Sequence, residues 1–264
     1  MDLIKLFSVL GLKRIATFQH RIFLTILYLL VNNLVFIVFW YVISTVTPVF
    51  SEEVAFTDTI LILAVVTYAF GLTNMFAPEL GTTLARLVYS GGLDSYLTLP
   101  QNPFYLLLLT RLDVVAFSEV LLGFAFFAFS QQPSFSQTVL FVIVATIAAA
   151  NILILQMFIG GLTFFLGNGE HLAKLYMGFL QTIAIYPLNV LGPYVVVILH
   201  TIMPVVLISY LPFQILSSDP VYPDYLFYIG GYLLLTGILG FMSFTLFKVG
   251  LRRYESGNLF TQLT

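Results

Sequence analysis

The stretch IFLTILYLLVNNLVFIVFWYVISTV, residues 22–46, decides the class of fold. It contains no charged residue, and a helix needs about 20 apolar residues to cross the hydrocarbon core of a bilayer. Basic residues precede it, and the run is longer than the apolar core of a signal peptide. The stretch therefore predicts a first membrane-spanning helix that is retained.

The rest of the 264-residue chain has the same character, because 60% of its residues are hydrophobic and only 8% are charged. Soluble globular proteins carry about 25% charged residues, and so few cannot cover a surface that faces water. This excludes a soluble enzyme. The Lys and Arg residues form no dense cluster, so we also exclude a nucleic-acid-binding protein. The composition predicts an all-α integral membrane protein.

Further apolar stretches have about the length of a span, and they cover residues 59–77, 104–129, 139–166 and 225–249. Residues 175–216 are also apolar, but they contain Pro187, Pro193, Pro204 and Pro212. Proline removes a helical hydrogen bond and clashes with the preceding turn. We therefore do not expect this stretch to form one or two straight helices.

The distribution of charge predicts how often the chain crosses the membrane, because basic residues concentrate in cytoplasmic loops. With the N-terminus inside and a single crossing within 175–216, all ten Lys and Arg residues are cytoplasmic. The outer loops would then be 47–58, 130–138 and 217–224, which contain acidic residues and no basic ones. This pattern predicts six spans in the cell (inner) membrane, with both termini cytoplasmic.

We place the fifth span at about residues 175–191, followed by a re-entrant hairpin at 193–216 whose two short helices divide near Pro204. A fifth span at 193–217, after an interfacial segment at 175–191, gives the same charge distribution and stays open. Residues 1–21 mix apolar and basic side chains, which predicts an interfacial N-terminal helix. Residues 1–264 would thus form a single transmembrane domain.

Three charged residues lie in the third predicted span, where an ionisable group is costly and is a functional candidate by default. Arg111 and Asp113 are near its inner end and are expected to reach the interface. Glu119 is sixteen positions into the span, so it either lines a polar cavity, handles protons, or pairs with a neighbouring helix. Amides in the spans are expected to form interhelical hydrogen bonds; they are Asn32, Asn33, Asn74, Asn151, Gln156 and Gln181.

The sequence contains no recognisable motif for nucleotide binding, metal binding or nucleophilic catalysis. It contains no GxxxxGK[ST] loop for phosphates, no cysteine, and only three widely separated histidines. We therefore expect no catalytic residue, metal site or cofactor site on this chain. If ATP drives its function, a separate subunit must bind the nucleotide.

Four motifs together point to a family. They are FQHRIF at 18–23, GGLDSYLTLPQNPFYLLLL at 91–109, YPLNVLGPYVVVILHTIMPVVLISYLP at 186–212 and GLRRYESGN at 250–258. In this combination and order the chain resembles the permease subunits of type-2 ATP-binding-cassette (ABC) exporters, in particular a six-span branch of that superfamily. The resemblance implies two permeases working with two separate ATPase subunits, which carry ATP and Mg²⁺.

The resemblance also implies a coupling helix in the cytoplasmic loop 78–103, between the second and third spans. The residues it assigns to this loop's contact with the ATPase are Arg86, Gly91, Gly92, Leu93, Asp94, Pro100, Asn102 and Pro103. The Gly91-Gly92 pair allows a sharp turn with positive φ. Pro100 and Pro103 stiffen the return to the third span.

The expected function is therefore export of a hydrophobic or amphiphilic substrate by alternating access, with the ATPase, a second permease and membrane lipid as partners. One alternative is a proton-coupled secondary transporter that uses Glu119 and Asp113 as a relay. Another is a membrane assembly subunit that transports nothing. Copurification of an ATPase would favour the first function, and proton-driven flux without ATP would favour the second.

Overall fold

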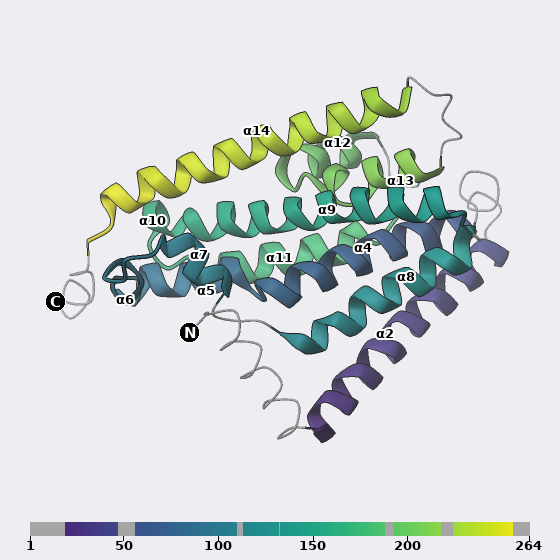
Figure 1. The fold of residues 1–264 in the computed structure, drawn as a ribbon, viewed down its shortest axis with the longest axis horizontal. Helices are drawn as coiled ribbons and strands as arrows, with labels where there is room; N and C mark the ends of the chain where they lie inside the picture. The colour runs from purple at the N-terminus through teal and green to yellow at the C-terminus, as the bar shows by residue number, and fades with distance from the viewer. Residues whose placement is uncertain are drawn as a thin grey trace.

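The computed structural model describes residues 19–46, 56–109, 113–131, 133–187, 193–217 and 224–255. Within these ranges all regular structure is helical (Figure 1). The long helices are α2 (Gln19–Val46), α4 (Phe56–Phe76), α9 (Phe135–Gly161) and α14 (Asp224–Arg253). The predicted interfacial helix at 1–21 falls almost entirely outside the described residues.

Four helical segments in the described ranges are long and apolar enough to cross a membrane. They lie in α2, in α4, in α14, and in α9 together with the short helix α10 (Thr163–Leu166). These correspond to the predicted spans 22–46, 59–77, 225–249 and 139–166. The all-helical membrane fold is thereby confirmed, and the total of six crossings stays a prediction.

The remaining helices are shorter. Between α4 and α9 the chain forms α5 (Leu80–Tyr89), α6 (Asp94–Leu97), α7 (Pro103–Leu109), the 3₁₀ turn η1 (Val114–Ala116) and α8 (Phe117–Gln131). Between α10 and α14 it forms α11 (Glu170–Ala184), α12 (Pro193–Ile202), the 3₁₀ turn η3 (Val205–Leu207) and α13 (Tyr210–Ser217).

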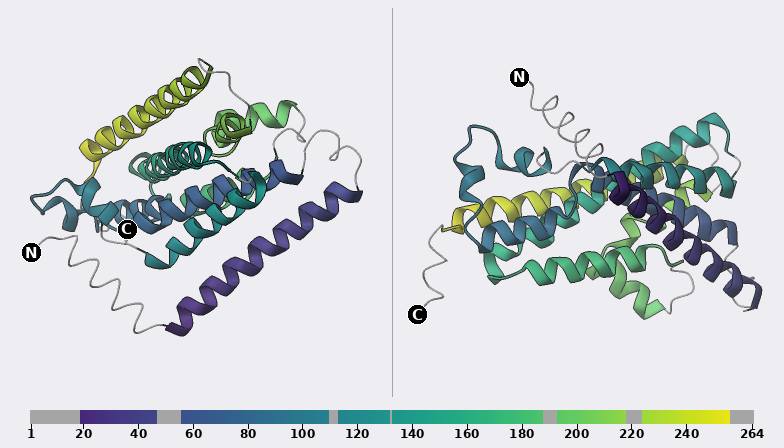
Figure 2. Two further views of the ribbon diagram at one scale, coloured as in Figure 1. Left: turned by 45° about the vertical axis from the view of Figure 1, so that its right-hand side comes forward. Right: turned by 90° about the horizontal axis from the view of Figure 1, so that it is seen from below.

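Helices α4 and α9 form the centre of the bundle (Figures 1 and 2). α14 packs along α9, α8 packs along α4, and α2 is the outermost helix. Within the apolar stretch of each helix, 72% of the residues of α4 are buried, against 11% in α2 and 17% in α14. The difference comes from packing, because α4 lies against both α8 and α9, whereas α2 is equally apolar but lies at the outside of the bundle.

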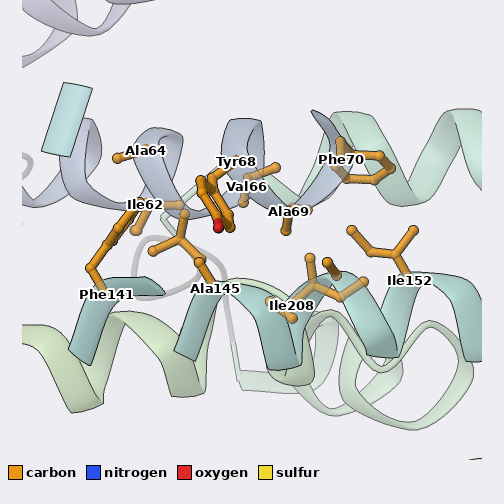
Figure 3. Packing of buried hydrophobic residues seen from close by; sticks show 14 of the residues in the cluster. Ile62, Ala64, Val66, Tyr68, Ala69, Phe70, Phe141, Ala145, Ile152 and Ile208 are labelled. Carbon is orange, nitrogen blue, oxygen red and sulfur yellow. The ribbon is translucent and has the colours of Figure 1, made fainter. Parts of the chain in front are cut away.

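The core lies between α4 and α9, as Figure 3 shows. Tyr68 of α4 makes an edge contact with Phe141 of α9, with ring centroids 5.4 Å apart. Ala145 and Ala149 of α9 are buried, and their small side chains let the two helices approach closely. The Thr73 hydroxyl of α4 uses this closeness and lies 3.1 Å from the Ala149 carbonyl oxygen.

The third predicted span, 104–129, is wrong as a single helix. Its described residues divide into α7, η1 and α8. The Asp113 carboxylate accepts a hydrogen bond from the backbone N–H of Val115, 2.9 Å away, and the backbone N–H of Asp113 donates to the Met75 carbonyl of α4. A side chain that caps a new turn competes with continuation of the previous helix. η1 and α8 together extend roughly 28 Å, which is still close to the thickness of a bilayer core.

The proline-rich stretch contains the expected break. α12 and α13 are two short helices with Pro204 and η3 between them. Tyr232 of α14 fixes this break, because its hydroxyl donates to the Leu207 carbonyl of η3 at 2.6 Å. Asn151 of α9 in turn lies within hydrogen-bond distance of Tyr232 and Thr236. That α12 and α13 form a re-entrant hairpin, and that residues 175–191 form the fifth span, stays a prediction.

The bundle has two ends that matter for function (Figure 1). The α6 end holds α5, α6, α7, α10 and the C-terminal end of α14. The α13 end holds α13 and the starts of α4, α9 and α14. Arg86 in α5 and Arg252 and Arg253 in the last turn of α14 belong to the α6 end.

Candidate functional site

The segment that joins α5 to α6 has a defined backbone shape. α5 ends at Ser90, and Gly91 follows with φ 74°, in the left-handed region that glycine adopts most easily. The backbone N–H of Leu93 then donates to the Leu87 carbonyl, which turns the chain back along α5. The Gly91-Gly92 pair is expected to allow a turn with positive φ, and Gly91 is the glycine of the pair that takes this conformation.

Leu93 attaches α6 to the bundle. Its side chain is fully buried, and it belongs to a cluster with Leu84 and Val88 of α5 and Phe247 of α14. Tyr254, just beyond α14, packs against the same cluster. Burial, and then the neighbouring Asp94 carboxylate, raise the pKa of Tyr254 to about 12, so its hydroxyl keeps its proton at physiological pH. The loop is thereby tied to both α5 and α14.

The surface beyond this attachment is exposed. Leu97 and Leu99 are 41% and 47% exposed, and Pro100 and Asn102 are exposed after them. Pro103 begins α7, a position where proline fits because the first helical N–H has no partner in the helix. Arg86 is exposed in the last turn of α5. The predicted coupling residues therefore lie together at the α6 end, where Asp94 opens α6.

A second feature is a cavity of about 320 Å³ between α2, α4, α8 and α11. It lies at the middle of the bundle's depth, since Asn32 and Asn33 are central in α2 and Thr67 is central in α4. Its polar lining is unusual for helices this apolar, and it comprises Tyr28, Asn32, Asn33, Thr67, Glu119, Gln181, Thr182 and Tyr186.

Glu119 reaches this cavity from the first turn of α8. The expected position deep inside a continuous span is therefore wrong, although the carboxylate does line a cavity, as one of the three hypotheses held. α4 and α8 touch here, because a Cβ built on Gly71 would lie 2.6 Å from the Cβ of Glu119. The Asn74 amide donates to a Glu119 carboxylate oxygen at 3.4 Å.

Aromatic rings line the cavity on the side toward the α13 end. Phe36 of α2 and Tyr186, after α11, line it, and their ring centroids are 6.2 Å apart in an edge contact. Trp40, one turn further along α2, lies behind them at 5.6 Å from Tyr186. Edge contacts of this kind are favourable beyond simple burial. The cluster ties α2, which is otherwise sparsely packed, to the chain after α11.

The other two charged residues of the third predicted span are Asp113 and Arg111, and only Asp113 lies within the described residues. Asp113 is exposed and caps η1, and its carboxylate is near enough to Glu119 to interact electrostatically. Among the described residues, no three His, Asp or Glu side chains gather closely enough to hold a metal ion.

Three of the six amides predicted to bond between helices do so. Asn74 bonds α8, Asn151 bonds α14, and the Gln156 side chain accepts the backbone N–H of Gly81 in α5. Asn32, Asn33 and Gln181 instead line the cavity with Glu119, and the Asn33 amide donates within α2 to the Leu29 carbonyl at 2.8 Å. The sequence indicated a polar position here, because Asn32 and Asn33 lie in the centre of an uncharged span. It did not indicate which helices face them.

A family model described as "ABC-2 family transporter protein" matches residues 30–257 of the chain. No curated protein and no solved structure matches. The matched range includes the α6 segment (residues 90–103, from the end of α5 to the start of α7), most of the cavity lining and the proline-rich break.

Proposed function

Because this multi-pass membrane protein belongs to the ABC-2 family of transporter proteins, we propose that it is the permease subunit of an ABC exporter. A separate ATPase subunit binds ATP and Mg²⁺ and supplies the energy. The chain itself performs no catalysis. Two permeases, identical or homologous, form the translocation path at their interface and move the substrate by alternating access.

The observation that carries this proposal is the construction of the α6 segment. Energy from another subunit has to enter through a protein contact, and such a contact needs an exposed surface on a firm support. Leu97 and Leu99 supply exposed apolar area, while Leu93 supplies the support. Hydrophobic side chains in the centre of a contact are typical of protein interfaces.

The path of the transmitted motion follows from the packing. Leu93 contacts a cluster shared by α5 and α14, and α5 packs against α9 and α11. A displacement of α6 therefore shifts α5 and the end of α14 together, because a packed interior transmits strain rather than absorbing it. α11 also lines the cavity through Gln181 and Thr182, so movement at the α6 end reaches the middle of the bundle.

We further propose that the α6 end is cytoplasmic, that the chain crosses the inner membrane six times, and that α12 and α13 form a re-entrant hairpin in the outer leaflet. The support is the charge pattern: the predicted outer loops contain no Lys or Arg. The native chain has no cysteine, so single cysteines test this. Cysteines at 90, 170 and 256 should resist an impermeant maleimide in intact cells, and those at 54, 134 and 220 should react.

The experiment that tests the function is affinity purification of the tagged chain from its native cells, followed by reconstitution. We expect an ABC ATPase to copurify, and ATP to drive flux of an amphiphilic reporter across proteoliposomes. Recovery of the chain with no ATPase would contradict the proposal, as would flux driven by a proton gradient without ATP.

The secondary-transporter alternative receives less support. Its relay requires a connection between Asp113 and Glu119, and in the described part of the chain no hydrogen bond joins them. Asp113 caps η1 and Glu119 accepts from Asn74. A Glu119→Gln variant that keeps ATP-driven flux would remove that alternative.

A further inference from the structure

The cavity between α2, α4, α8 and α11 is lined by amides that can donate hydrogen bonds, such as Asn32 and Gln181, and by two groups that offer only acceptors. Glu119, as a carboxylate, only accepts hydrogen bonds. The Thr182 hydroxyl donates its single hydrogen to the Gly178 carbonyl at 2.9 Å, so toward the cavity its oxygen can only accept. A molecule that fits between these two groups has to bring hydrogen-bond donors.

The cavity also has an unequal charge. Among the described residues, Glu119 is the one carboxylate in the lining, and no Lys or Arg lines the cavity. Asp113 adds a second negative charge nearby. The Glu119 carboxylate accepts one long hydrogen bond from the Asn74 amide, so its negative charge is only partly compensated. A cation beside it would offset the cost of removing this charge from water.

The remaining lining is apolar and aromatic. Leu63, Val66 and Phe70 of α4 line one wall of the cavity. Phe36 and Tyr186 line its side toward the α13 end. Aromatic faces attract ammonium groups as well as hydrocarbon. The volume of about 320 Å³ is at the lower end of the range for small-molecule sites, which are mostly apolar with a few placed polar groups.

From these features we propose that this cavity is a binding site for cationic amphiphiles, with a protonated amine at Glu119 and Thr182 and an apolar body against α4 and the aromatic rings. This rests on the proposed permease function and specifies its substrate class. The site is built from residues of one chain, whereas the proposed translocation path lies at the interface of two permeases.

The test is direct binding to the purified full chain in phosphatidylcholine nanodiscs, without the ATPase. The probes are dodecylammonium and N-dodecylacetamide, which share the alkyl chain and differ in charge, and empty nanodiscs provide the background. We expect the chain to bind dodecylammonium at least tenfold more tightly than the acetamide. A charge-assisted hydrogen bond in such a site accounts for about that factor.

Variants locate the site. Glu119→Gln keeps the shape of the side chain and should weaken dodecylammonium binding at least tenfold, while acetamide binding stays unchanged. Glu79→Gln, which removes an exposed carboxylate outside the lining, is the matched control and should change neither. Thr182→Val, at an exposed position of α11, should weaken ammonium binding without loss of stability, and it decides the question if Glu119→Gln does not fold.

Equal affinity for the two probes would overturn the proposal, and so would undiminished ammonium binding in both Glu119→Gln and Thr182→Val. Neither result depends on ATP or on the ATPase. A chain that copurifies with an active ATPase but shows no preference for the ammonium probe would refute the substrate class and leave the permease function standing. If the chain shows the preference for the ammonium probe in nanodiscs but no ATPase copurifies with it from its native cells, the permease function is refuted and the binding site stands.

Discussion

Replacement of Leu93 by Ala should release α6 from the bundle. The Leu93 side chain is 0% exposed, and truncation to Ala removes three carbon atoms from its cluster. At about 0.8 kcal/mol for each buried CH₂ the transfer loss is roughly 2.4 kcal/mol, and the cavity left behind brings the cost to about 3 kcal/mol. α6 has four residues, and one turn cannot hold itself helical without such a contact.

Hydrogen exchange of the backbone amides of residues 94–97, measured on the chain in nanodiscs, reports this release. A loss of about 3 kcal/mol predicts exchange faster by roughly a hundredfold if local opening limits it. In the complex with the ATPase, ATP hydrolysis should continue while transport falls, because the contact surface persists but its support is lost.

Leu99→Ala is the matched control, because it removes the same atoms from a side chain that is 47% exposed. Its exchange at 94–97 should equal that of the native chain, while its affinity for the ATPase should fall. Unchanged exchange in Leu93→Ala, or equal changes in the two variants, would refute Leu93 as the attachment of α6.

Three further variants test separate contacts. Gly91→Ala should lower stability by about 1–2 kcal/mol, since φ is 74° there, and Gly92→Ala should cost less in the same denaturation assay; equal costs would contradict the assigned turn. Tyr232→Phe should cost about 1 kcal/mol by removing the hydrogen bond to Leu207, whereas Tyr228→Phe, at an exposed position, should be neutral in mixed-micelle unfolding. The pKa of Tyr254 is raised from 10.0 to about 12 in the folded chain, so the folded state holds this proton more tightly and stability should fall as pH rises from 10 through 12. Thermal melts at pH 9 and pH 11 should show a smaller fall for Tyr254→Phe, and an identical fall would exclude this contribution.

The long helices could be predicted within a few residues because each is an apolar run with few interruptions. Residues 22–46 contain no charge at all, and α2 ends at Val46 as expected. The prediction of the third span as one helix was wrong for a local reason. Asp113 caps a new turn inside a stretch whose hydropathy indicated a single helix. Hydropathy averages over a window and does not register a single cap.

The α6 segment could be predicted from the sequence, whereas the cavity could not. The Gly91-Gly92 pair and Pro103 are local turn and helix-start signals, so the loop was predictable, although which glycine takes positive φ depends on how α5 ends. The cavity brings together single residues from four helices, among them Asn32, Glu119 and Gln181. Nothing in their spacing along the chain says that they meet, because that depends on how the helices pack.

Cross-linking from α6 tests the proposed coupling most directly. A photoreactive maleimide on Leu97→Cys, in a chain with no other cysteine, should form a covalent adduct with the copurifying ATPase, and its yield should change when ATP is added. The same probe on Gln137→Cys, exposed at the start of α9 at the α13 end, should form none. An adduct from residue 137 and none from residue 97 would contradict the assignment of α6 as the contact with the ATPase.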